Sequence, residues 1–268
     1  MTAAPFREAE GRVALVTGAS RGLGAAIAER LAETGAKVAV AARTMDPDPK
    51  YEGSLRETVA RIRASGGIAH PVQSDISSAT DRAAMIDEVV RELGPIDILV
   101  NNAAVTFLLP FTEFPEKRFR LMFEVQVRAP FELAQLAVPS MRERRQGWIL
   151  NITSRAGVHP VGPPYETFHT SGATVYGMVK AALDRFTTGL AAELHADGIA
   201  VNSLAPWDNV ATPGASAHDL VAGYALEGPE WMAEAALALC TGDPTKLTGR
   251  IAYSQPLLAE LQRRPHNP

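Results

Sequence analysis

The strongest constraint on the fold is a repeated alternation of short apolar runs with segments of helical periodicity. The runs at 13–17, 37–42 and 96–101 are rich in Val, Ile, Leu and Ala, which is typical of strands that helices cover on both faces. Each run is followed by a segment with the spacing of an amphipathic helix. Because strand–helix–strand units close with right-handed crossovers, this pattern predicts a parallel, doubly wound sheet.

The same criteria extend along most of the chain. Strands are expected at 13–17, 37–42, 68–74, 96–101, 148–153 and 199–205, and helices at 22–34, 54–65 and 78–93, with a further helix that contains Tyr176 and Lys180 and runs to about 196. The helical region 115–145 contains Pro130 and Pro139, which predict a kink or a split there. We expect an α/β protein with a Rossmann fold, a parallel sheet of about seven strands with helices on both faces.

The chain shows no internal repeat, low-complexity linker or charge block that would divide its 268 residues. One domain over 1–268 is therefore expected, with a core at about 11–254. The ends, 1–10 and 260–268, are polar and are expected to be loose.

Composition excludes several classes of function. A net charge of −4 argues against a nucleic-acid partner. The absence of a long apolar run argues against a membrane span and against a secretory signal. A single cysteine, Cys240, excludes an internal disulfide and favours the reducing cytoplasm. The six histidines are scattered, so no metal site is predicted.

The first predicted strand runs directly into TGASRGLG, residues 17–24, where the first helix begins. Gly18, Gly22 and Gly24 permit a tight turn and allow backbone N–H groups to approach a phosphate. Such a glycine pattern alone is a weak signal. Placed between the first strand and the first helix of a doubly wound sheet, it predicts that a dinucleotide binds here.

The residues after the second strand indicate which dinucleotide binds. An NAD enzyme places an acid at the end of this strand, to accept a hydrogen bond from the ribose 2′-hydroxyl. This chain has Ala42 and Arg43 there, and Arg21 lies in the glycine loop. Two guanidinium groups can hold a 2′-phosphate, although both arginines could simply be solvated surface residues. The charges favour NADP(H) over NAD(H).

The stretch VYGMVKAAL, residues 175–183, contains Tyr176 and Lys180 four positions apart. On a helix both side chains lie on one face, as a catalytic pair or as a half-buried tyrosine beside a solvated lysine. The chain has five tyrosines, and only Tyr176 is followed by a lysine four residues later. Its place after the fifth strand, near the carboxyl edge of the sheet, favours a role in chemistry.

These motifs, in this order, resemble the short-chain dehydrogenase/reductase family over roughly residues 11–212. TGASRGLG resembles the coenzyme loop, NNAA (101–104) resembles the NNAG turn of the family, and ITSRAG (152–157) contains its active-site serine. Tyr176 and Lys180 match the YxxxK motif. The loop RTMDPDPKYEG, with the residues that follow it, is most similar to the hydroxysteroid dehydrogenase-like branch.

The resemblance implies the site residues. The coenzyme-binding set is Gly18, Ser20, Arg21, Gly22, Leu23, Gly24, Arg43, Thr44, Asp75, Ile76, Asn102, Ala103, Ala104, Tyr176, Lys180, Pro206, Val210 and Thr212. The catalytic set is Ser154, Tyr176, Lys180 and Gln126. Tyr176 is then the general acid or base, and Lys180 lowers its pKa and holds the nicotinamide ribose. Ser154 binds the substrate oxygen.

Three departures from the family pattern bear on activity. Gln126 stands where the family usually has an asparagine that anchors a proton relay, and Trp207 replaces a glycine after Pro206. The segment between Ser154 and Tyr176 is longer than usual and contains Tyr165 and Phe168. Ser154, Tyr165, Phe168 and Trp207 are the expected substrate-binding residues. Trp207 could also be a lid residue packed on the sheet, and the longer segment could be an exposed loop without a ligand.

The resulting hypothesis is a cytoplasmic, NADP(H)-dependent carbonyl reductase or alcohol dehydrogenase that acts on a mostly apolar ketone or secondary alcohol. Two alternatives are an NADPH-binding sensor with little turnover and an epimerase or dehydratase on the same fold. The resemblance also implies a homodimer or homotetramer.

Overall fold

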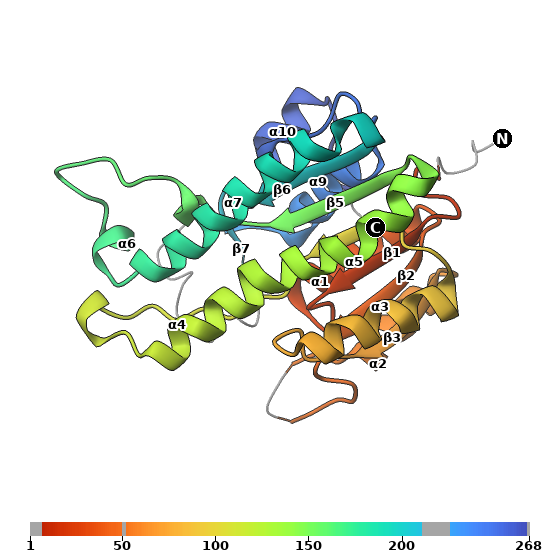
Figure 1. Cartoon of the computed structure of the whole chain (residues 1–268), viewed down its shortest axis with the longest axis horizontal. Helices are drawn as coiled ribbons and strands as arrows, with labels where there is room; N and C mark the ends of the chain where they lie inside the picture. Colours follow the sequence, from red (N-terminus) through yellow and green to blue (C-terminus); the bar gives the residue numbers. More distant parts are fainter. Residues whose placement is uncertain (1–6, 50–51, 211–225, 267–268) are drawn as a thin grey trace.

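The computed structural model describes residues 7–49, 52–210 and 226–266 of the chain. Its centre is a parallel sheet of seven strands in the order β3-β2-β1-β4-β5-β6-β9 (Figure 1). The strands are β1 (Val13–Thr17), β2 (Lys37–Ala42), β3 (Ile68–Gln73), β4 (Ile98–Asn101), β5 (Gly147–Ile152), β6 (Ile199–Ala205) and β9 (Ile251–Tyr253). The predicted Rossmann architecture is thus confirmed.

Helices cover both faces of the sheet. They are α1 (Gly22–Glu33), α2 (Leu55–Ala64), α3 (Ala79–Leu93), α4 (Glu116–Phe123), α5 (Ala129–Arg144), α6 (Thr167–Thr170), α7 (Thr174–Leu194), α9 (Pro229–Thr241) and α10 (Ser254–Glu260). Apolar side chains of α1, α2, α9 and α10 pack on one face, and those of α3, α5 and α7 pack on the other. Leu15 and Val16 of β1 are fully buried on opposite faces, as expected from the continuous apolar runs.

Local sequence explains where several helices begin. The Ser54 hydroxyl accepts from the backbone N–H of Glu57 at 3.2 Å and donates to its side chain at 2.8 Å. Ser78 forms the same reciprocal pair with Asp81 at the start of α3. Such caps satisfy backbone donors that the first helical turn leaves free, so α2 and α3 begin within one residue of the predicted positions.

The helical region 115–145 differs from the prediction. It is interrupted by a π-helical segment at Glu124–Arg128, between α4 and α5. Pro139 lies inside α5 without ending it, and Pro130 lies in the first turn of α5. The split therefore precedes both prolines. Pro130 still contributes to it, because in an α-helix the Gln126 carbonyl would accept a hydrogen bond from the N–H of residue 130, and proline has no N–H.

Two segments project from the sheet on the same side, one before α4 and one containing α6 (Figure 1). They are joined by a hydrogen bond from the Leu109 N–H to the Gly172 carbonyl, at 3.2 Å. A short parallel pair, β7 (Asn209–Val210) and β8 (Leu226–Glu227), lies after β6.

Parts of both ends, which we expected to be loose, pack on the body. Ala9 is fully buried, and Arg263 forms ion pairs with Glu8 and Glu234 at 2.7 and 2.6 Å. None of the helices within the described ranges is long and apolar enough to cross a lipid bilayer.

Candidate active site

The glycine loop forms a cradle of backbone atoms between β1 and α1. Gly18 has a φ of +68°, and a Cβ atom at this position would lie 2.8 Å from the Ala103 Cα. A Cβ on Gly24 would lie 2.4 Å from the Asn102 Nδ2. Only glycine fits at either place. Because α1 has no side-chain cap and no acid in its first turn, its N-terminal N–H groups can bind the phosphates of a dinucleotide.

Asn102, which follows β4, holds this cradle in place. Its side-chain amide donates to the carbonyls of Thr17 and Gly18 at 2.8 and 3.2 Å. The Thr17 hydroxyl accepts from the N–H groups of Asn102 and Ala103 at 3.0 and 3.2 Å and donates to the Val100 carbonyl at 3.2 Å. The predicted residues Asn102 and Ala103 thus contact the glycine loop directly, whereas the contribution of Thr17 was not predicted.

Two cations lie at the end of β2, where the ribose of the adenosine is expected. The Arg21 guanidinium donates to the Thr44 hydroxyl at 3.2 Å and to that of Ser20 at 3.4 Å. Arg43 is exposed and acts electrostatically on Asp75. A cleft of about 460 Å³, lined in part by Ser20 and Arg21, borders the loop. These polar groups fit the 2′-phosphate of NADP.

Asp75 and Ile76 follow β3, at the expected adenine end. Burial of Asp75 opposes its ionisation, but hydrogen bonds from the N–H and the hydroxyl of Ser77, at 3.0 and 2.8 Å, together with the charge of Arg43, lower its pKa below the ordinary value. Ile76 is half-buried and packs on the core of that face. Asp75 is therefore a fixed carboxylate that can accept a hydrogen bond.

Tyr176, Lys180 and Ser154 converge at the carboxyl edge of the sheet. Tyr176 and Lys180 lie one turn apart on α7, and the Lys180 Nζ is 5.8 Å from the centre of the tyrosine ring. Lys180 is 3% exposed and donates to the Ile152 carbonyl at 2.9 Å. Ser154 precedes the 3₁₀ turn Arg155–Gly157, and its hydroxyl is close enough to Tyr176 to act on the pKa of the phenol. The structure thus brings together the three residues expected to carry the chemistry.

The pKa values of this pair differ from the expectation. Burial raises the pKa of Tyr176, and the nearby Ser154 hydroxyl opposes that rise. Burial lowers the pKa of Lys180 to about 8, and the negative charge of Asp184 opposes that shift. Burial disfavours the charged form of each group, so the pKa of Tyr176 lies above its ordinary value.

Gln126 lies in the π-helical segment, buried beside the loop after β4. Its Nε2 donates to the Val105 carbonyl at 2.7 Å, while its Oε1 is buried and has no hydrogen-bond partner among the described residues. π-Helical segments frequently mark functional sites. The side chain thus ties the π-helical segment to the loop that follows Asn102.

A chain of buried hydrogen bonds joins three of the elements that carry the site. Asn101 donates to Asn151 at 2.8 Å, and Asn151 donates to the Thr187 hydroxyl at 2.8 Å. This chain of bonds joins β4, β5 and α7. It was not predicted, although Asn101 and Asn151 are adjacent in register at the ends of neighbouring strands.

Trp207 lies after β6, and three residues hold it in place. Its N–H donates to the buried Ser254 hydroxyl at 3.0 Å, and its carbonyl accepts from Arg155 at 3.3 Å. Its ring lies 5.9 Å from that of Tyr253, edge to face, and 5.1 Å from the Arg155 guanidinium. Because Arg155 follows Ser154 directly, Trp207 is fixed next to the serine turn.

The other residues expected at the site have fewer contacts that fix their positions. Tyr165 is 54% exposed, and its ring packs on Gly162 of its own loop. Phe168 is half-buried in α6, in contact with His169. Leu23, Pro206 and Val210 lie along the same edge of the sheet, Ala104 is exposed, and Thr212 falls outside the described residues.

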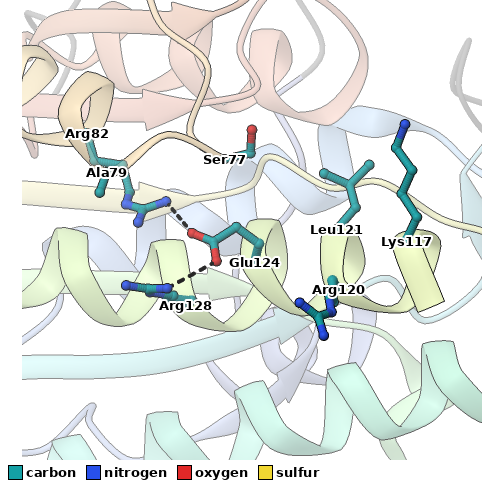
Figure 2. A pocket seen from close by; sticks show the side chains of 8 residues that line it. All are labelled: Ser77, Ala79, Arg82, Lys117, Arg120, Leu121, Glu124 and Arg128. Carbon is teal, nitrogen blue, oxygen red and sulfur yellow. Dashed lines mark hydrogen bonds and ion pairs between the residues drawn. The ribbon is translucent and has the colours of Figure 1, made fainter.

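A second cleft, of about 450 Å³, lies between the start of α3 and the π-helical segment (Figure 2). Its wall is an ion-pair network in which Glu124 joins Arg82 and Arg128, at 2.9 and 3.6 Å. Arg82 is 1% exposed, and it also pairs with Glu132 and donates to the Ile76 carbonyl. The network fixes α3 to α5 and holds the loop at Ile76, so we assign it a structural role.

Comparison with known proteins identifies the family of this chain. The family model for short chain dehydrogenase matches residues 12–217. Hydroxysteroid dehydrogenase-like protein 2 of Danio rerio is 33% identical over 247 residues, which are 91% of this chain and 57% of that protein. This chain thus spans little more than half the length of that relative.

Solved structures agree with the fold. A short chain dehydrogenase of Mycobacterium thermoresistibile has a TM-score of 0.80 and 33% identity, over 94% of this chain and 88% of that one. A 3-oxoacyl (acyl-carrier-protein) reductase of Agrobacterium tumefaciens with NADP bound has a TM-score of 0.79 and 29% identity, over 92% and 94% of the two chains. The chain belongs to the short-chain dehydrogenase/reductase family of oxidoreductases.

Proposed function

We propose that this protein is an NADP(H)-dependent oxidoreductase that interconverts a ketone and a secondary alcohol. The observation that carries the proposal is the convergence of Tyr176, Ser154 and Lys180 at the edge of the sheet that also holds the glycine cradle. When bound, the nicotinamide donates or accepts the hydride. One proton must then move between the protein and the substrate oxygen.

The chain supplies the groups for that proton. The Tyr176 hydroxyl, on whose pKa Ser154 acts, donates its proton to the substrate oxygen in reduction and accepts one in oxidation. The Ser154 hydroxyl donates a hydrogen bond to the same oxygen and stabilises the charge that develops there. The Lys180 ammonium favours the phenolate and holds the coenzyme ribose, and Gln126 fixes the neighbouring helix.

NADP(H) is the proposed coenzyme because Arg21, Arg43 and Thr44 lie at the end of β2, where an NAD enzyme places an acid. A related structure with NADP bound supports this choice. Arg43→Ala should weaken NADPH binding at least 10-fold, in the range of about 1.5–3 kcal/mol for a charged hydrogen bond, and leave NADH binding nearly unchanged. Lys246→Ala, a distant exposed cation, is the control, and equal losses for both coenzymes would refute the choice.

The substrate is proposed to be mostly apolar, with Trp207 as a wall of the pocket and Phe168 and Tyr165 nearer its opening. Support comes from the fixed position of Trp207 beside the serine turn. The cytoplasm is the proposed compartment, which is consistent with the single thiol of Cys240, buried in α9.

A homodimer or homotetramer is proposed through α5 and α7. Phe131 and Leu136 of α5 and Met178 of α7 are each more than 40% exposed. The rings of Phe131 on α5 and Phe186 on α7 contact each other at 5.9 Å, and exposed apolar side chains of this kind are common at interfaces between subunits. The proposed unit is one coenzyme-binding domain per chain.

A panel of ketones with NADPH tests the enzyme hypothesis. We expect consumption of NADPH, and we expect Tyr176→Phe to abolish turnover while NADPH affinity is retained. The alternative, a sensor that binds NADPH without chemistry, is suggested by the departures at Gln126 and Trp207. Tight NADPH binding without turnover across the panel would favour that alternative.

A further inference from the structure

Asp184 is a buried acid that the proposed reaction does not yet use. It lies on α7 one turn after Lys180 and two turns after Tyr176, and it is 8% exposed. Its Oδ1 has no hydrogen-bond partner among the described residues. Gly157, at the end of the serine turn, is so close that a Cβ there would lie 2.9 Å from the Asp184 Oδ2.

Lys180 needs a counter-charge because it is buried as well. A buried ammonium is costly unless it is paired, and within the described part of the chain the Lys180 ammonium donates to a neutral carbonyl, that of Ile152. Asp184 supplies the negative charge that raises the pKa of Lys180 against the effect of burial. Because the two residues are four positions apart on one helix, their side chains share a face.

The groups around Asp184 come from three other elements. The hydroxyls of Thr153, after β5, and Ser203, on β6, are buried and face the carboxyl without reaching full hydrogen-bond geometry. Burial raises the pKa of Tyr253 of β9, the negative charge of Asp184 adds to that rise, and Arg155 opposes it. Burial raises the pKa of Asp184 itself, while the two hydroxyls and Lys180 oppose that rise.

We propose that Asp184 is a positioning residue whose carboxylate keeps Lys180, which lies beside Tyr176, in its ammonium form. Thr153 and Ser203 stabilise the carboxylate, and the close approach of Gly157 couples it to the turn that presents Ser154. The consequence for catalysis rests on the function proposed above. The electrostatic relation between Asp184 and Lys180 does not.

The test is a proton titration of Lys180 in the full-length, coenzyme-free protein. The chain has five lysines, so labelling with ¹³Cε-lysine gives few NMR signals, and Lys180→Arg identifies the one that is lost. We expect the Lys180 midpoint near pH 8 in the wild type and lower by about one pH unit or more in Asp184→Asn. Asp184→Glu, which keeps the charge, should restore most of the shift.

Glu193→Gln is the matched control, because Glu193 is an exposed acid on the same helix, and it should leave the midpoint unchanged. An unchanged or higher midpoint in Asp184→Asn overturns the proposal. Should that variant not fold, the wild-type carboxyl signal of Asp184 decides the question. Ionisation throughout about pH 6–8 supports the proposal, and a protonated carboxyl in that range overturns it.

Turnover provides a separate readout. If the wild type reduces ketones, the basic limb of its pH profile should move to lower pH in Asp184→Asn, because Lys180 then loses its proton sooner. If the wild type shows no turnover, the proposed function fails, while the titration of Lys180 still decides the role of Asp184.

Discussion

The close contact between the glycine loop and the turn after β4 can be tested by substituting three glycines. Together they separate the cost of a side chain at positive φ from the cost of a Cβ atom placed too close to its neighbours. Gly66 has a φ of +81° and open space around its Cβ position. Gly24 has no positive φ, but a Cβ there would lie 2.4 Å from both the Gly18 carbonyl oxygen and the Asn102 amide. Gly18 combines a φ of +68° with contacts of 2.8 and 2.9 Å.

The magnitudes follow from these geometries. Gly66→Ala should cost about 1–2 kcal/mol, the cost of a left-handed conformation for a residue with a Cβ. Gly24→Ala should cost about 1–3 kcal/mol through overpacking, even though alanine is favoured over glycine in a helix. Gly18→Ala carries both costs, which sum to about 2–5 kcal/mol.

Urea unfolding of the three variants measures these costs, and NADPH titration shows which of them reach the site. We expect Gly18→Ala and Gly24→Ala to weaken NADPH binding and Gly66→Ala to leave it unchanged. If Gly24→Ala proves no less stable than the wild type, or if Gly66→Ala is the most damaging of the three, the close packing inferred for the cradle is wrong.

Three further predictions concern groups outside the cradle. Arg82→Met should lower the free energy of unfolding by about 1–3 kcal/mol, because Glu124 and the Ile76 carbonyl lose their buried donor; unchanged stability in urea would contradict the structural role given to that network. Burial raises the pKa of Cys240 to about 12, so its thiol should resist a thiol reagent at pH 8 in the folded protein and react in urea; equal rates would contradict its burial. Lys180 loses its proton near pH 8 when folded and near 10.5 when unfolded. Between these values the unfolded state binds more protons, so the stability of the wild type relative to Lys180→Met should rise with pH over this window, and a decline there would contradict the assigned shift.

The parts of the fold that follow from local pattern were predictable. Strands buried on both faces, such as β1 and β4, are marked by apolar runs, and helices α2 and α3 begin at capping serines. The last strand, β9, was not assigned because it has only three residues and Ile251 is 45% exposed. Helix α9 is buried at every position from Met232 to Cys240, so it lacks the polar face by which a surface helix is recognised.

For the candidate site, too, local sequence motifs were predictable and long-range contacts were not. Motifs within one segment, such as the glycine loop and the pair Tyr176–Lys180, were visible in the sequence. Contacts that join distant segments were not visible in the sequence. Examples are the hydrogen bonds from Asn102 to the glycine loop and the hydrogen bond from the Trp207 N–H to the Ser254 hydroxyl. These depend on strand order and register, which bring the carboxyl ends of β1, β4, β5, β6 and β9 to one edge.

The burial that shifts the pKa values of Tyr176 and Lys180 has an unequal effect on the two directions of the proposed reaction. Because burial raises the pKa of the phenol and lowers that of the ammonium, it favours the neutral form of each group. A neutral phenol already holds the proton that ketone reduction requires. Alcohol oxidation instead requires a phenolate, which must be stabilised by positive charge from Lys180 and from the oxidised coenzyme. Retaining the charge of Lys180 therefore matters more for oxidation, and loss of Asp184 should impair oxidation more than reduction at neutral pH.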